Sequence, residues 1–163
     1  MRREPQVYRL IGDFTTYGRY FPMASMLEEK EAIRDLMSAY CFYVDNCEFE
    51  KFADLFTEDA QFEAGPLGKL CGREAIREFI AGSIPNRGEG PARKHCTLNH
   101  LINVSGASAR ADSYIIVLRE ADNGIIASLA GRYEDVLVKQ NGEWRFKVRK
   151  IHFDISGDLG LKK

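Results

Sequence analysis

The feature that most limits the possible folds is a change in the spacing of apolar residues about halfway along the chain. Before residue 81, apolar side chains recur every three or four positions, as on helices that bury one face. From residue 93 they alternate or run continuously, as in β-strands. Helices followed by consecutive strands predict an α+β fold, in which the helices pack on one face of a curved antiparallel sheet.

Three helices are expected in the first half. The longest covers residues 25–45 and has one continuous apolar stripe. A shorter helix covers 49–56 and buries its phenylalanines, and a third covers 72–81. The segment between them, 57–72, is expected to be loop with one short strand at 60–64.

Four strands are expected in the second half, separated by turn signals such as Asn141-Gly142. They cover 93–104, 107–119, 124–139 and 143–155. The helices and strands together predict one domain over residues 26–156. Residues 1–25 are an aromatic-rich extension, expected to pack on the domain or on a neighbouring subunit, and residues 157–163 are a C-terminal tail.

Composition excludes several classes of function. The 163 residues carry a net charge of −1, which argues against nucleic acid or an anionic membrane as the main partner. No apolar run approaches the roughly 18 residues of a membrane span, and the N-terminus lacks the apolar segment of a secretory signal. The four cysteines form no C-x-x-C pair, so they are interpreted as reduced thiols of a cytoplasmic protein. The three histidines lack the carboxylate cluster of a metal site, so no metal is expected.

Four segments resemble the NTF2-like superfamily, and within it the SnoaL-like branch, over residues 27 to 155. In order, these segments are EAIRDLMSAYCFYVD, GREAIREFI, KHCTLNHLINV and GRYEDVLVKQNGEWRFKVRK. The resemblance implies a cone, in which a curved sheet wraps around a long helix and encloses a pocket. The small residues Ala127, Ala130 and Gly131 are consistent with such a cavity.

Among the lyases of this family, the chain looks most like scytalone dehydratase, bile acid 7α-dehydratase and hexachlorocyclohexane dehydrochlorinase. These proteins share an aspartate near the end of the long helix and a histidine at the start of a central strand, which match Asp45 and His95 here. The bile acid enzyme also has a tyrosine five residues before the aspartate, which matches Tyr40. A second catalytic histidine of scytalone dehydratase falls near Arg119, so a mechanism with two histidines is not implied.

These three residues suit a cofactor-independent elimination or isomerisation. His95 would remove a carbon-bound proton, Asp45 would orient the imidazole, and Tyr40 would donate a proton to an oxygen. The expected substrate is a small, apolar, cyclic molecule. The other residues expected to contact it are Asn99, Phe62, Leu129 and Tyr133.

Each residue also has a structural interpretation. Asp45 and Glu48 have the spacing of a capping box for the second helix, and Tyr40 lies on the apolar stripe of the first. Simple alternation points His100, not His95, toward the apolar face of its strand. His95 can face a pocket if a bulge or bend near Asn99 shifts the register, or if the pocket lies on the more polar face.

Two other functions remain open. The chain could be a non-catalytic partner, like the small subunit of an aromatic-ring hydroxylating dioxygenase, or a small-molecule binding module. A homo-oligomer, dimer or trimer, is expected, and a homo-oligomer without a larger partner would argue against the subunit function.

Overall fold

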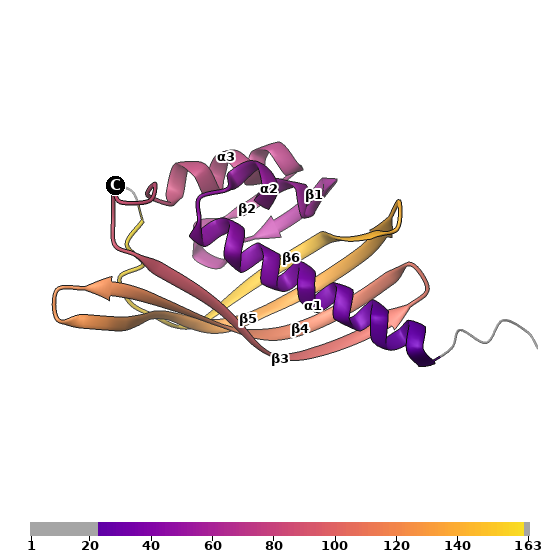
Figure 1. Cartoon of the computed structure of the whole chain (residues 1–163). Coiled ribbons are helices and arrows are strands. Elements are labelled where there is room, and N and C mark those ends of the chain that lie inside the picture. The colour runs from indigo at the N-terminus through magenta and orange to yellow at the C-terminus, as the bar shows by residue number, and fades with distance from the viewer. Residues whose placement is uncertain (1–22, 162–163) are drawn as a thin grey trace, which may run out of the picture.

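The computed structural model of the chain describes residues 23–161, so most of the predicted extension 1–25 lies outside the described residues. Two helices and two short strands precede a third helix and four long strands (Figure 1). In chain order the elements are α1 (Met23–Asp45), α2 (Phe49–Asp54), β1 (Phe56–Glu63), the 3-10 turn η1 (Gly65–Leu67), β2 (Lys69–Cys71), α3 (Arg73–Ser83), β3 (Arg93–Ser105), β4 (Ser108–Ala121), β5 (Gly124–Gln140) and β6 (Glu143–Ser156).

Helix α1 lies across one face of the sheet, while α2 and α3 lie at one end of it (Figure 1). The apolar stripe predicted from the sequence is the buried side of α1, with Ile33, Met37, Tyr40 and Val44 all at most 3% exposed. The helix begins at Met23, two residues earlier than expected. None of the helices within residues 23–161 is long and apolar enough to cross a membrane.

The sheet has six strands in the order β2-β1-β6-β5-β4-β3. The four long strands form the predicted antiparallel meander. The sequence did not predict that β1 would start as early as Phe56, nor that it would pair in parallel with β6. Its polar residues 57–59 interrupt the apolar alternation, and its register with β6 shifts between Phe56 and Gln61.

A bulge in β3 changes which side chains face the helices. Leu98 lies opposite Tyr114 on β4, and Leu101 lies opposite Asp112. Three steps along β3 therefore match two along β4, so β3 holds one extra residue between Leu98 and Leu101. Asn99 in this bulge has a φ of +54°, a left-handed conformation that asparagine adopts more readily than most residues. Because side chains alternate along a strand, the extra residue lets both His95 and His100 face inward. The expected bulge near Asn99 is therefore confirmed.

Gly131 has a different role from the one suggested by the sequence. A Cβ at this position would lie 2.1 Å from the backbone carbonyl oxygen of His152, at a bulge in the β5–β6 pairing. The glycine therefore allows β6 to approach closely, and it does not leave space for a cavity.

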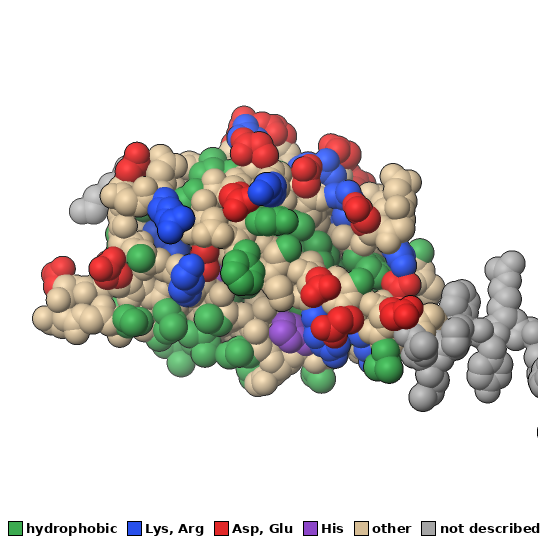
Figure 2. Space-filling view, in the orientation of Figure 1, with side chains coloured by type: hydrophobic (Ala, Val, Ile, Leu, Met, Phe, Trp, Pro, Cys, Tyr) green, Lys and Arg blue, Asp and Glu red, His purple; other side chains and the backbone are tan. Residues whose placement is uncertain are grey.

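The face of the sheet that is turned away from α1 carries exposed apolar side chains. Leu101, Tyr114 and Ile155 are 54–72% exposed there. Figure 2 shows further hydrophobic side chains along the lower left edge, over the end of the β4–β5 hairpin, where Leu118, Ile125 and Ile126 are exposed.

Candidate active site

Asp45 and His95, which are 50 residues apart in the sequence, meet in a buried contact between the end of α1 and the start of β3. The Nδ1 of His95 lies 2.6 Å from Oδ1 of Asp45, and the backbone N–H of His95 donates to Oδ2 at 3.0 Å. The His95 side chain is 14% exposed, and the Asp45 side chain is 5% exposed. Because an ionised carboxylate only accepts hydrogen bonds, the contact favours the tautomer of the neutral imidazole that carries its proton on Nδ1, and in this tautomer Nε2 has a free lone pair.

This contact decides between the two interpretations of Asp45. Helix α2 begins after Glu48, and no side chain hydrogen bond caps its N-terminus. The capping box predicted from Asp45 and Glu48 does not form, because Asp45 is still the last residue of α1 and Glu48 stands at the N-cap of α2.

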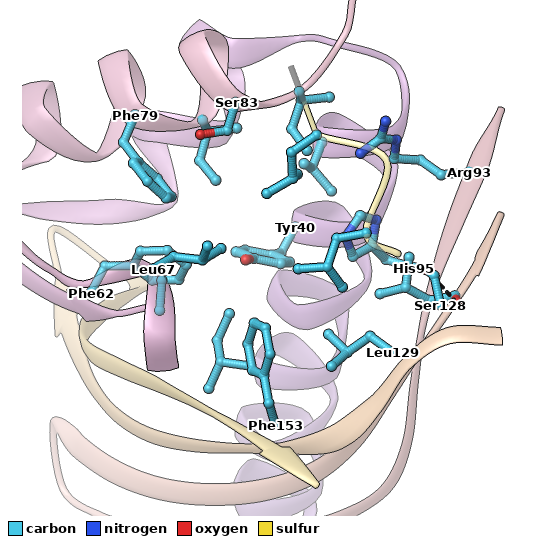
Figure 3. Close-up of a pocket in the computed structure, with 18 of the residues that line it drawn as sticks. Tyr40, Phe62, Leu67, Phe79, Ser83, Arg93, His95, Ser128, Leu129 and Phe153 are labelled. Atoms are coloured by element: carbon cyan, nitrogen blue, oxygen red, sulfur yellow. Dashed lines mark hydrogen bonds between the residues drawn. The ribbon is translucent and has the colours of Figure 1, made fainter. Parts of the chain in front are cut away.

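A mostly apolar cavity with a volume of about 90 Å³ lies beside His95, between the sheet, α1, α3 and the C-terminal residues. Five residues expected at the site line this cavity, which Figure 3 shows, while Asp45 does not line it and reaches it only through its contact with His95. Those five are Tyr40, Phe62, His95, Leu129 and Tyr133. Asn99 does not line the cavity, since it is exposed at the bulge of β3.

Tyr40 and Tyr133 place two phenols in the cavity wall, and their rings pack edge to face with centroids 5.7 Å apart. Burial raises the pKa of Tyr40 to about 12, although the positive charge of Arg149 and a hydrogen bond from Tyr133 act in the opposite direction. Burial likewise raises the pKa of Tyr133. Both hydroxyls therefore stay protonated at neutral pH. Because the single O–H of Tyr133 donates to Tyr40, the Tyr40 hydroxyl is the one that can donate to a ligand oxygen. In the view of Figure 3, the Tyr40 hydroxyl points away from His95, toward Phe62 and Leu67.

A buried ion pair lies behind the two phenols. Arg149 donates from Nε and Nη2 to the two oxygens of Asp135 at 2.9 Å, and both side chains are fully buried. The guanidinium carbon lies 4.1 Å from the ring centroid of Tyr40 and 3.8 Å from that of Tyr133, within range of cation–π attraction. Burial disfavours the charge of Arg149, but the Asp135 carboxylate outweighs it and raises the pKa of Arg149.

Sequence reasoning missed this pair because simple alternation places Arg149 on the outer face. Trp144 and Phe146 are buried, so the next inward residue should be Val148. A bulge at Lys147, visible as a register shift between β5 and β6, turns Arg149 inward instead. The sequence offers one signal for this buried pair. A basic residue follows directly after an alternating apolar run, and an acid lies on the neighbouring strand.

The second inward-facing histidine, His100, does not line the cavity. Its Nε2 is buried and makes no hydrogen bond within residues 23–161. Burial lowers the pKa of His100, and the positive charges of Arg34 and Arg149 act in the same direction. His100 is therefore a neutral residue under α1.

The C-terminal segment 157–161, here called the strap, closes one side of the cavity with Leu159 and Leu161. Arg119 pairs with Asp158 at 2.9 Å, and the Nη2 of Arg93 donates to the Gly160 carbonyl at 3.1 Å. An engineered apolar cavity of about 150 Å³ holds one benzene molecule. The cavity beside His95 is smaller than this, and Leu159 and Leu161 of the strap form part of its wall.

Within the described part of the chain, no three His, Cys, Asp or Glu side chains gather as they would around a metal ion. The polar groups of the cavity wall are instead the imidazole, the phenols, two serines and Arg93. This set can accept a proton, donate hydrogen bonds and bind an anion.

The fold and the cavity define a class of protein, the NTF2-like α+β cones with a pocket between a curved sheet and a long helix. Comparison of the sequence with known families places the chain more narrowly. The SnoaL-like domain matches residues 25–150, and the chain belongs to this family.

Several solved structures are similar to the chain. A protein of unknown function from Mycobacterium tuberculosis is 29% identical, with a TM-score of 0.74 over 84% of this chain and 78% of that one. A candidate scytalone dehydratase from Novosphingobium aromaticivorans is 26% identical, with a TM-score of 0.73 over 86% and 94%. A candidate aromatic ring hydroxylase from the same organism shares the fold at 24% identity, with a TM-score of 0.67 over 83% and 93%. No curated protein matches the sequence.

Proposed function

We propose that the protein is a cofactor-independent lyase or isomerase that acts on a small, largely apolar cyclic molecule. The observation that carries this proposal is the Asp45–His95 pair, whose imidazole forms part of an apolar cavity wall. The similarity to a candidate scytalone dehydratase supports the same class of reaction.

In the proposed reaction, His95 is the base. Its Nε2 lone pair takes a proton from a carbon of the ligand that is acidified by a neighbouring carbonyl group, and the C–H electron pair remains with the ligand. Asp45 holds Nδ1–H and stabilises the imidazolium that forms. Since the pair is almost fully buried, the two charges attract each other more strongly than they would in water.

The electron pair then determines the product. In an elimination it forms a C=C bond while the neighbouring C–O bond breaks, and the departing oxygen takes a proton from the imidazolium or from the Tyr40 phenol to leave as water or an alcohol. In an isomerisation the imidazolium returns the proton to another carbon. Because its pKa is raised to about 12, Tyr40 reaches this step as a protonated donor.

A screen of cyclic hydroxy- and keto-compounds, followed by mass spectrometry for loss of water, tests the proposal. Turnover should disappear in His95→Ala and persist in His100→Gln, which removes a histidine of the same strand that does not line the cavity. A His95→Ala protein with full turnover would rule out the mechanism.

A non-catalytic partner, similar to the small subunit of an aromatic-ring dioxygenase, is the second candidate. The similarity to a candidate aromatic ring hydroxylase supports only the shared fold. A buried acid–imidazole pair beside an apolar cavity favours the enzyme, because a surface used only for assembly does not need it. Turnover by the purified chain without a larger partner would decide for the lyase, and a requirement for such a partner would decide against it.

A further inference from the structure

We propose that the cyclic ligand carries a carboxylate and that Arg93 binds it. This inference rests on the proposed function only in taking the cavity beside His95 as the ligand site. Arg93 lies on β3 two residues before His95, so both side chains project from the same face of the strand. Both line the cavity, and Figure 3 shows them reaching toward its interior from the same side.

Arg93 is a half-buried cation that lacks a carboxylate partner. No Asp or Glu oxygen within residues 23–161 lies at ion-pair distance from its guanidinium, whereas the neighbouring Arg119 pairs with Asp158. The Gly160 carbonyl accepts one hydrogen bond from Nη2 of Arg93. A guanidinium has five N–H donors, so most of its capacity is left for a ligand.

The surroundings of Arg93 disfavour its charge. Burial lowers the pKa of Arg93, and Arg119 on β4 acts in the same direction, while Asp45 opposes them. Withdrawing a cation from water without a matching anion costs free energy, and a bound anion removes this cost. A ligand carboxylate at Arg93 would provide the missing partner, with the two-point geometry that guanidinium and carboxylate groups share.

Arg93 also lines a second hollow, in which three cations face two acids. Arg87 and Lys94 face this hollow as well, and its acids are Glu120 and Asp45. Asp45 is already bound to His95. The boundary between the apolar cavity and this hollow is therefore a place where an apolar ring and an anionic group of the same molecule can both be accommodated.

The spacing along β3 makes the ligand class more specific. Two residues along a strand separate Cα atoms by roughly 6.6 Å. A carboxylate on Arg93 and a C–H bond at the Nε2 of His95 can therefore belong to one small ring with its substituent. A neutral apolar ring would leave the Arg93 donors unmatched.

Benzoate and benzamide are matched probes for this proposal, because they share a ring and a shape but differ in charge. Neither has a leaving group, so their binding does not depend on whether the protein is a lyase. We expect isothermal titration calorimetry to give an affinity for benzoate that is about ten- to one-hundredfold higher than for benzamide, the range for charge-assisted hydrogen bonds. Arg93→Gln should remove this preference by lowering the affinity for benzoate much more than the affinity for benzamide.

The control is Arg110→Gln, which makes the same change in charge at an exposed arginine of β4 that lines neither the cavity nor the second hollow. It should keep the preference for benzoate. Equal affinities for the two probes in the unaltered protein would overturn the proposal, and so would equal losses in the two variants, because long-range charge alone would then explain them.

A second measurement does not depend on whether the Arg93→Gln variant folds. In the unaltered protein, the NMR signal of the Arg93 Nε–H should shift on addition of benzoate and not of benzamide, and the absence of that difference overturns the assignment. If neither probe binds, both the role of Arg93 and the proposed ligand site are wrong. If benzamide binds as tightly as benzoate, only the role of Arg93 fails.

Discussion

Asp45 binds His95 at two points, the ring Nδ1 at 2.6 Å and the backbone N–H at 3.0 Å. The carboxylate therefore fixes both the rotation of the imidazole and the position of the strand that carries it. Among the described residues this contact joins the end of α1 directly to the start of β3.

Replacing Asp45 by asparagine should keep the fold and remove most of the activity. The amide can still accept one hydrogen bond, but it no longer stabilises an imidazolium, and it permits the wrong tautomer of His95. We expect kcat to fall by a factor of about 10²–10⁴, the range for general-base catalysis. Steady-state kinetics and far-UV circular dichroism check this expectation. Asp59→Asn, at an exposed acid of β1 that does not line the cavity, should leave kcat unchanged.

Removing one member of the Asp135–Arg149 pair should destabilise the protein strongly. Asp135→Ala leaves a buried guanidinium without its anion, which typically costs about 3–5 kcal/mol of unfolding free energy. Urea unfolding measures this loss, and adding Arg149→Met to the variant should recover part of it. The exposed pair Lys150–Glu134, at 3.8 Å, is the control, and Glu134→Ala should cost less than about 1 kcal/mol. A loss in Asp135→Ala no larger than this would contradict the prediction.

His100 should make the folded state less stable in mildly acidic solution. Burial lowers its pKa below the ordinary value of 6.5, so the unfolded chain binds a proton at a higher pH than the folded chain does. Stability is therefore retained above pH 6.5 and falls as the pH decreases through this value. In His100→Gln, the decrease in Tm between neutral and mildly acidic pH should be smaller than in the unaltered protein. His152→Gln, at a half-exposed histidine near Glu134, is the comparison. Identical pH profiles for His100→Gln and the unaltered protein would refute the assignment.

The strap should control the rate at which ligands enter. Leu159→Ala with Leu161→Ala removes bulk from the closed side of the cavity, and stopped-flow measurements with benzamide should give a faster association rate. Leu67→Ala, which shortens a leucine elsewhere in the cavity wall, should change the association rate much less. If Leu67→Ala accelerates entry as much as the double variant does, ligands do not enter past the strap.

The exposed face of the sheet should mediate self-association. Tyr114 lies opposite Leu98 on neighbouring strands, and both are exposed on the face away from α1. A second copy of the chain is the partner that we expect, since a net charge of −1 gives little repulsion between copies. Light scattering should detect a homo-oligomer, and Tyr114→Glu should dissociate it. Ile125→Glu, at the tip of the β4–β5 hairpin, should leave it intact, and a monomeric unaltered protein would contradict the expectation.

The sequence predicted the main elements because their apolar patterns are long and regular. Helix α1 and strands β3 to β6 all lie within a few residues of their expected bounds. Strand β1 was largely missed, because its buried residues Phe56, Ala60 and Phe62 are not evenly spaced. Its pairing with β6 joins residues about 90 positions apart, which local spacing cannot indicate.

For the candidate site, the residues that obey local patterns were easier to find than those displaced by bulges. Tyr40 lies on a helical stripe, and Phe62, Leu129 and Tyr133 have the apolar or aromatic character of a cavity wall. The partner of Asp45 was inferred from family resemblance. Arg149 could not be found, because the extra residue at Lys147 reverses the alternation on which such reasoning depends.

The bulge in β3 also determines one way in which this chain can change in length. Three steps along β3, from Leu98 to Leu101, match two steps along β4, and this extra residue lets His95 and Ile102 both face inward. Deleting one residue between Leu98 and Leu101 would remove the bulge and restore regular alternation, with both side chains still on the inner face. A chain that is one residue shorter in this segment can therefore keep the Asp45–His95 contact on a strand without a bulge.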